Sequence, residues 1–234
     1  MKKLLIATVV ATISSGAIAA DLKPYIEGSI GYYNLDDVDT KTYGGTLTAG
    51  GYDVSGSGRI RIGYDNPLGG GLELGVKNIG IENLRIGASF QRAKFDMKSV
   101  NVQGTINYTD NGDPADEGSV GVDVNATSFV RDTLGVDLNN TMNLYMANAY
   151  YDIKNSSAFT PFVGLGIGMA DVKNAKDNEF AWSASLGGKY NLTSNVYLGV
   201  KAAYTNVNGI TDKLGIQYED HKVYSGHALL GYEF

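Results

Sequence analysis

The sequence predicts an all-β protein, a transmembrane up-and-down antiparallel β-barrel of eight strands with long extracellular loops. Three observations predict this fold. The chain begins like an exported protein, its apolar residues alternate with a period of two, and its connections alternate between short and long. After the first segment, no apolar run approaches the roughly 18–20 residues that a membrane-spanning helix requires.

The N-terminal segment has the three parts of a secretory signal peptide. A basic start is followed by apolar residues 4–13 and by small residues that end at Ala19. We therefore expect residues 1–19 to be a cleaved signal peptide and residues 20–234 to form the barrel domain. Together with the strand pattern, this predicts export to the cell outer membrane of a Gram-negative bacterium.

The composition agrees with a membrane barrel and argues against a disulfide-stabilised protein and a nucleic-acid-binding protein. The chain has 31 glycines and 16 tyrosines but only 4 prolines, which suits many strands with tight turns and interfacial aromatic side chains. It has no cysteine, so disulfides cannot stabilise it. With a formal net charge of −6 and no basic cluster, the chain is not expected to bind nucleic acid.

Eight segments carry the period-two pattern from which the strands are predicted. In each, apolar side chains occupy one face and polar or small side chains the other. The segments are residues 24–32, 59–64, 72–77, 145–153, 159–169, 180–190, 196–205 and 224–234.

The connections between these segments alternate in length, as in a barrel with short turns on one side and long loops on the other. Residues 65–70, 154–158 and 191–195 are short links, whereas 34–56, 78–143 and 207–222 are long and 171–179 is intermediate. We expect residues 78–143 to form a long extracellular loop or a hairpin insertion. Alternation within residues 84–90 and 100–108 leaves ten spanning strands as the alternative.

The polar faces of the strands predict a charged interior. Burying so many charges in an apolar core would cost several kcal/mol each, so we expect them to point inward and to pair with one another. This lumen charge network comprises Glu27, Arg59, Arg61, Glu73, Lys77, Asp152, Lys189, Lys201, His227 and Glu233.

Aromatic residues near both ends of the opposite faces predict two girdles at the membrane interfaces. Aliphatic residues occupy the band between them, and a soluble barrel has no reason for this pattern. The interface residues are Tyr32, Tyr64, Tyr145, Phe159, Phe180, Trp182, Tyr190, Tyr204, Tyr224, Tyr232 and Phe234.

The C-terminal half resembles a known family. The ending Leu-Gly-Tyr-Glu-Phe at 230–234 resembles the assembly signal of outer-membrane barrels, and residues 149–153 and 159–168 resemble the small outer-membrane β-barrel superfamily. That superfamily includes opacity-type proteins and rickettsial major surface antigens. The resemblance covers residues 145–234 well and the first three strands loosely. It implies an eight-stranded barrel and roles in adhesion, surface exposure, weak porin activity or envelope integrity.

The search for catalytic or metal-binding chemistry yields weak candidates. The glycines at 164, 166 and 168 lack the strand–loop–helix context of a nucleotide loop, so we interpret them as making room in the lumen. Ser225, His227 and Glu233 share one face, but residues two apart on a strand make direct contact marginal. The acidic stretch at 110–117 lacks the spacing of an EF-hand. We expect no enzymatic activity, no metal and no cofactor.

The leading functional hypothesis is a surface protein whose barrel anchors exposed loops for adhesion or surface interaction and supports envelope integrity. A narrow, low-conductance porin is the alternative, and an outer-membrane lipid hydrolase comes third. The expected partners are outer-membrane lipid, a host or surface ligand bound by the loops, and periplasmic chaperones and the barrel-assembly machinery, which would recognise Phe234. We expect a monomer.

Overall fold

The computed structural model describes residues 22–113, 115–133, 139–213 and 215–234. The expected signal peptide at residues 1–19 lies outside them. Among the described residues, no helix combines the length and the apolar character needed to cross a membrane.

Eight antiparallel strands close into a barrel, as the sequence predicts, and each pairs with the barrel strands before and after it in the chain. β13 closes the barrel by pairing with β1. The barrel strands are β1 (Lys23–Leu35), β5 (Leu68–Lys77), β6 (Leu84–Phe95), β9 (Asn140–Asp152), β10 (Phe159–Val172), β11 (Glu179–Asn191), β12 (Val196–Val207) and β13 (His221–Glu233).

The strand count is confirmed, but one strand assignment is wrong. Residues 59–64 belong to β4 (Tyr52–Tyr64), which pairs with β7 outside the barrel. The barrel strand that they were expected to supply is β6, within the segment that was expected to be a loop or hairpin. Alternation shows only that one face of a strand is buried differently from the other, and it does not identify the sheet to which the strand belongs.

Short turns lie at one end of the barrel, and the other end carries three long connections together with the short link of residues 173–178. The turn between β5 and β6 is short because Asn78, Gly80 and Asn83 adopt positive φ angles of 64°, 64° and 69°, which asparagine and glycine tolerate best. Residues 153–158 and 192–195 form the other short turns.

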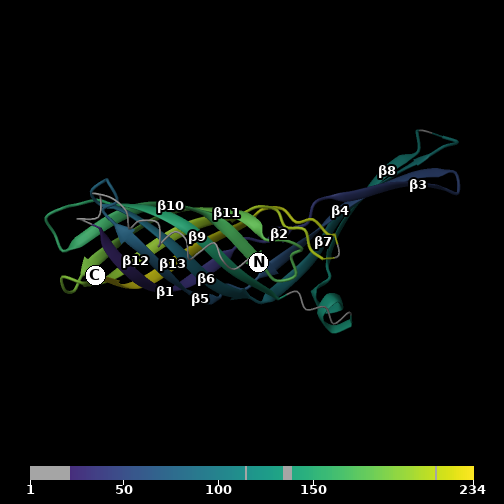
Figure 1. Ribbon diagram of the computed structural model, residues 1–234. Helices are drawn as coiled ribbons and strands as arrows, with labels where there is room; N and C mark the ends of the chain where they lie inside the picture. The colour runs from purple at the N-terminus through teal and green to yellow at the C-terminus, as the bar shows by residue number, and fades with distance from the viewer. Residues whose placement is uncertain (1–21, 114, 134–138, 214) are drawn as a thin grey trace.

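Two of the long connections build a second sheet of five strands, here called the projecting sheet. It extends beyond one end of the barrel, opposite the C-terminus (Figure 1). β4 lies between β7 on one side and both β2 and β3 on the other, and β8 forms the outer edge. The further strands of this sheet are β2 (Val38–Asp39), β3 (Tyr43–Ala49), β7 (Met97–Asp110) and β8 (Glu117–Asn125).

The barrel interior is apolar at the end next to the projecting sheet. Fourteen buried residues pack there, here called the mouth cluster. They come from the barrel strands and from two long connections, and the interior at this level resembles the core of a soluble protein. The members are Tyr33, Leu35, Val38, Ala93, Phe95, Met142, Leu144, Met146, Ala170, Val172, Ala181, Val207, Ile210 and Val223.

Candidate functional site

Below the mouth cluster, toward the short turns, inward-facing charges form what we call the charge layer. Four carboxylates and four cations contribute to it, so opposite charges are available in equal number. The members are Glu27, Glu73, Asp152, Glu233, Lys77, Arg85, Lys189 and Lys201.

Arg85 lies at the centre of the charge layer and is 1% exposed. Its Nε donates to Asp152 Oδ1 at 2.9 Å, and Glu27 Oε2 lies 4.0 Å from its Nη1. The guanidinium carbon is 4.7 Å from the ring centre of Tyr150 and 5.0 Å from that of Phe162. Charge pairing and cation–π contact together compensate the desolvation of this cation.

Two lysines join the carboxylates nearest the short turns. Lys189 Nζ lies 2.8 Å from Asp152 Oδ2 and 3.2 Å from Glu233 Oε1. Lys77 Nζ lies 3.7 Å from Asp152 and 3.5 Å from Glu233. Because both lysines contact the same two carboxylates, their ion pairs link four strands: β5, β9, β11 and β13.

Phenol and amide groups satisfy the other two carboxylates. Glu73 accepts hydrogen bonds from the hydroxyls of Tyr25 at 2.5 Å and Tyr150 at 2.8 Å, and from the Asn148 amide at 2.8 Å. Glu27 accepts one from the Tyr197 hydroxyl at 2.8 Å. These two carboxylates are therefore hydrogen-bonded, which lowers the cost of burying them. Arg85 Nη2 is buried without a hydrogen-bond partner among the described residues.

The inward glycines of β10 make room for this layer, as the sequence predicts. A Cβ atom at Gly164 would lie 2.3 Å from a ring carbon of Tyr150, and one at Gly166 would lie 2.4 Å from Asn148 Oδ1. Only glycine allows these two long side chains to cross the lumen.

Eight of the ten residues predicted for the lumen lie inside the barrel, but the placement of Arg59 and Arg61 there is wrong. Both belong to β4 of the projecting sheet. Arg61 donates to Asp39 at 2.8 and 3.0 Å, and Arg59 lies 3.3 Å from the same carboxylate. The hydrogen bond from Arg61, together with the positive charges of Arg61 and Arg59, lowers the pKa of Asp39.

The contact between Ser225 and His227 is closer than the sequence suggests. His227 Nε2 lies 2.9 Å from Ser225 Oγ, so the expectation of marginal contact is wrong. His227 is 5% exposed, its Nδ1 has no hydrogen-bond partner in the described residues, and Glu233 is occupied by Lys77 and Lys189. A hydrolytic set requires a group that orients the base, and these contacts do not supply one.

The predicted aromatic residues other than Tyr64 lie on the outside of the barrel strands and form two groups. Phe159 pairs with Tyr190 near the short turns, where Tyr232 packs edge-on against Phe234. Around the other end, a chain of ring contacts joins Trp182, Tyr204 and Tyr224, and Tyr32, Tyr145 and Phe180 lie on the same side. Exposed aliphatic residues, such as Leu165 and Leu198, occupy the band between the two groups.

Tyr64 was expected at a membrane interface, and this placement is wrong. It lies at the barrel mouth, where it packs against the mouth cluster with its ring centre 6.5 Å from that of Phe95. Burial raises the pKa of Tyr64 to about 12.

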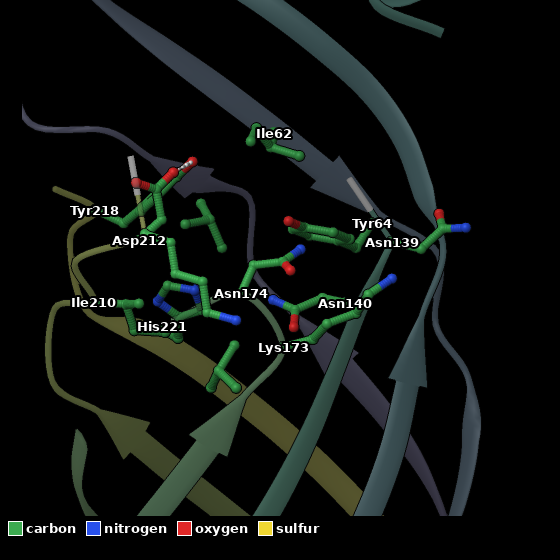
Figure 2. A pocket seen from close by; sticks show the side chains of 13 residues that line it. Ile62, Tyr64, Asn139, Asn140, Lys173, Asn174, Ile210, Asp212, Tyr218 and His221 are labelled. Carbon is green, nitrogen blue, oxygen red and sulfur yellow. Dashed lines mark hydrogen bonds between the residues drawn. The ribbon is translucent and has the colours of Figure 1, made fainter. Parts of the chain in front are cut away.

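Tyr64 also lines a pocket of about 320 Å³ between the barrel mouth and the long connections. Figure 2 shows Asn140, Asp212, Tyr218 and His221 around it. The Tyr218 hydroxyl donates to Asp212 at 3.4 Å, and burial together with that carboxylate raises the pKa of Tyr218. The pocket is a depression over a closed lumen, since the buried mouth cluster lies beneath it.

The projecting sheet separates its side chains by polarity, with Asp110 at the tip as the exception. Directly paired residues share a face of a sheet, so the register assigns every residue to one of two faces. We name them the polar face and the apolar face. The polar face carries Thr46, Thr48, Asp53, Ser55, Ser57, Arg59, Arg61, Asn101, Gln103, Thr105, Asn107, Thr109, Ser119, Asp123 and Asn125. The apolar face carries Tyr43, Leu47, Tyr52, Val54, Ile60, Val102, Ile106, Tyr108, Val120, Val122 and Val124.

Sequence reasoning missed two features of the molecule. Arg85 was not identified because residues 84–90 were not assigned to the barrel, although its position in their alternation is an inward one. The apolar face was missed because residues 59–64 of β4 were assigned to the barrel and the other segments of the sheet were expected to be loops or a hairpin. The alternation in residues 100–108 was a usable signal for it.

Comparison with known proteins agrees with this architecture. The family model described as outer membrane protein beta-barrel domain matches residues 65–234. The outer membrane protein PagN of Salmonella typhimurium is 36% identical over 86 residues, which cover 30% of this chain and 36% of PagN, so the match spans about a third of that relative. The crystal structure of neisserial surface protein A superposes with a TM-score of 0.50 at 12% identity, covering 90% of this chain and 97% of the other.

Proposed function

Since the chain belongs to the outer membrane protein beta-barrel domain family, we propose that it is a surface protein of the Gram-negative outer membrane whose barrel anchors the projecting sheet for adhesive contact outside the cell. The observation that carries the proposal is the exposed apolar face of that sheet. Monomeric proteins rarely leave a large contiguous apolar surface in water, and such a surface is typical of an interaction site.

The position of the sheet agrees with this role. Outer-membrane barrels place short turns in the periplasm and long connections outside. The projecting sheet is built from two long connections, at the end opposite the short turns (Figure 1). A rigid scaffold that carries exposed segments is a common arrangement for binding.

The packing of the barrel supports an anchoring role. The charge layer and the mouth cluster occupy two successive levels of the interior, and their side chains are buried. An eight-stranded barrel has an interior just wide enough for such side chains. By linking strands across the lumen, the charge layer would also contribute to the stability of the protein in the envelope.

Two further partners belong to the same proposal. Outer-membrane lipid would cover the aliphatic band and the two aromatic groups. Phe234, which is 68% exposed at the end of the last strand, would be recognised by periplasmic chaperones and the barrel-assembly machinery.

Adherence of whole bacteria tests the proposal. The full chain is expressed in a non-adherent Gram-negative strain, and binding to cultured epithelial cells and to matrix-coated glass is compared with that of the empty vector. Ile106→Asp places a charge on the apolar face, and Asn107→Asp places the same charge on the polar face of the same strand. We expect Ile106→Asp to lower adherence about tenfold, as loss of a buried anchor does, and Asn107→Asp to keep it.

The proposal is contradicted if cells that express the wild-type chain adhere to every surface no better than cells with the empty vector. Heat-modifiable gel mobility shows that each variant contains a folded barrel, so a loss of adherence can be attributed to the sheet.

A further inference from the structure

We propose that the apolar face of the projecting sheet packs against the apolar face of a second copy of this chain, forming a two-layered β-sandwich outside the membrane. The inference rests on the proposed function in one respect, because it takes the projecting sheet to be outside the cell. It goes further by naming the occupant of the apolar face. The adhesive contact would then be made by the paired sheets, and Ile106→Asp would lower adherence by separating them.

The apolar face is exposed and carries almost no charge. Leu47 is 66% exposed, Val120 54% and Ile106 43%, and these residues come from three different strands. Between β3 and β8, the register places mainly valine, isoleucine, leucine, tyrosine and glycine on this face. Among the described residues that this register pairs, its one charged residue is Asp110, which is paired with Tyr52 at the tip.

The described part of the chain covers only the base of this face. Ile62 and Val100 are 4% and 2% exposed, because they lie against the barrel mouth. The Tyr43 hydroxyl accepts a hydrogen bond from the Gln217 backbone at 2.7 Å, which marks how far the loop before β13 reaches. Beyond Tyr43, each of the four long strands keeps exposed apolar side chains, while Val54 and Val122 are partly buried. The exposed ones are Leu47, Tyr52, Ile106, Tyr108 and Val120.

The physics of sheets indicates what completes such a face. A sheet with one apolar side is stable when that side is covered, and the common cover is a second sheet about 10 Å away. The exposed apolar side chains present on the order of 600 Å², at the upper end of what a monomer exposes. This approaches the ~800 Å² that each partner contributes to a standard interface.

A second copy fits this face better than an unrelated surface does. Two-fold pairing brings the same patch to both sides, so a flat apolar face meets a flat apolar face and no charge is buried unpaired away from the tip. The charged groups of the sheet, such as Arg61 and Asp123, remain in water on the polar face. Anchoring in a membrane also raises the effective concentration of one copy near another.

This inference differs from the monomer expected from the sequence. The projecting sheet was not expected from the sequence, since residues 59–64 of β4 were expected in the barrel and its other segments in loops.

Site-specific crosslinking in cells tests the inference. The chain has no cysteine, so single cysteines can be introduced without background. Ile106→Cys lies on the apolar face, and Asn107→Cys lies on the polar face of the same strand. Each variant is co-expressed with two different epitope tags and treated with a short bifunctional maleimide. We expect Ile106→Cys to give about tenfold more dimer carrying both tags than Asn107→Cys.

A second pair of cysteine variants, on another strand, shows whether a local folding defect explains the first result. Leu47→Cys and Thr46→Cys are neighbours on β3 that point to opposite faces, and they should repeat the contrast. If neither apolar-face cysteine gives more mixed-tag dimer than its control, in barrels shown to be folded by heat-modifiable mobility, the inference is wrong.

The two proposals can fail separately. Absence of crosslinking together with adherence that depends on Ile106 would overturn the second-copy inference and retain a surface-interaction protein with a different partner. Crosslinking without any adherence would support the inference and contradict the proposed function.

Discussion

Arg85 is the residue whose loss should reveal what the charge layer contributes to stability. It is the most deeply buried cation of that layer, and it contacts Asp152, Glu27 and two aromatic rings. Its removal leaves carboxylates with fewer partners in a confined space, and breaking a buried ion pair costs more than the pair contributes while intact.

We predict that Arg85→Met lowers the free energy of unfolding by about 3–5 kcal/mol. Urea unfolding of the refolded protein in micelles, followed by the fluorescence of Trp182, measures this change. Arg59→Met is the matched control, because Arg59 pairs with Asp39 on the exposed projecting sheet and its loss should cost less than about 1 kcal/mol. Equal costs for the two variants would show that the charge layer does not stabilise the barrel.

Asp39 makes the attachment of β2 to β4 dependent on pH. Its pKa is lowered in the folded protein by the hydrogen bond and charge of Arg61, so the unfolded segment binds a proton more tightly than the folded one. The ion pair therefore stabilises the attachment above the ordinary pKa of an aspartate. This contribution is lost as the pH falls through the lowered pKa.

Amide exchange checks this second prediction. The Thr40 N–H donates to the Ile60 carbonyl at 2.9 Å, so its protection reports on the attachment. We expect the protection factor of Thr40 to fall between about pH 5 and pH 2, where the Asp39 carboxylate is protonated. In Asp39→Asn the protection should be lower and unchanged over that range, and a retained pH dependence would exclude Asp39 as its source.

At the scale of elements, the sequence predicts strands better than it predicts their sheets. Seven of the eight predicted segments overlap a barrel strand, because a lipid-facing side and a lumen-facing side impose a period of two. Residues 59–64 have the same period for a different reason, since Ile62 faces the barrel mouth and Arg61 faces water. Sheet membership depends on long-range pairing, which local alternation does not encode.

The candidate site was predictable to the extent that it follows the barrel pattern. Glu27 and Lys189 were found because they alternate with lipid-facing residues in strands that were correctly assigned. The apolar face depends on the register of β4 with β7, which is set by contacts between segments far apart in the chain, and on the β7–β8 hairpin, which was not expected from the sequence.

A topology experiment distinguishes the observed elements from those expected from the sequence. Gly80 lies in the short turn between β5 and β6, whereas Gly112 lies in the turn between β7 and β8 at the tip of the projecting sheet. A protease site inserted after Gly112 should be cleaved in intact cells. The same site after Gly80 should be cleaved only after the outer membrane is permeabilised, because that turn faces the periplasm. Cleavage at Gly80 in intact cells would show that this turn lies outside the cell, as expected if residues 78–143 form one external loop.

At the scale of the whole molecule, the barrel and the projecting sheet differ in where they expose apolar side chains. The barrel has a buried, paired interior and an apolar outside, whereas the projecting sheet has an exposed apolar face and a hydrated polar one. The first arrangement suits an anchor in lipid, and the second suits contact with another protein surface in water. β2 follows β1 after two residues and β7 follows β6 after one, so the contact surface is joined directly to the anchor.

The final prediction concerns ion conduction. An ion entering from the outer end would have to pass the mouth cluster, where Phe95, Val207 and Val223 are buried, and would lose its hydration with no polar group in exchange. Below that level, Arg85 and Lys189 cross the lumen and are held by Asp152. We therefore expect the refolded protein to give no discrete channels in planar bilayers, while its heat-modifiable mobility shows a folded barrel. Reproducible unitary currents from folded protein would mean that these side chains move aside together, and the narrow-porin hypothesis would then replace the anchor.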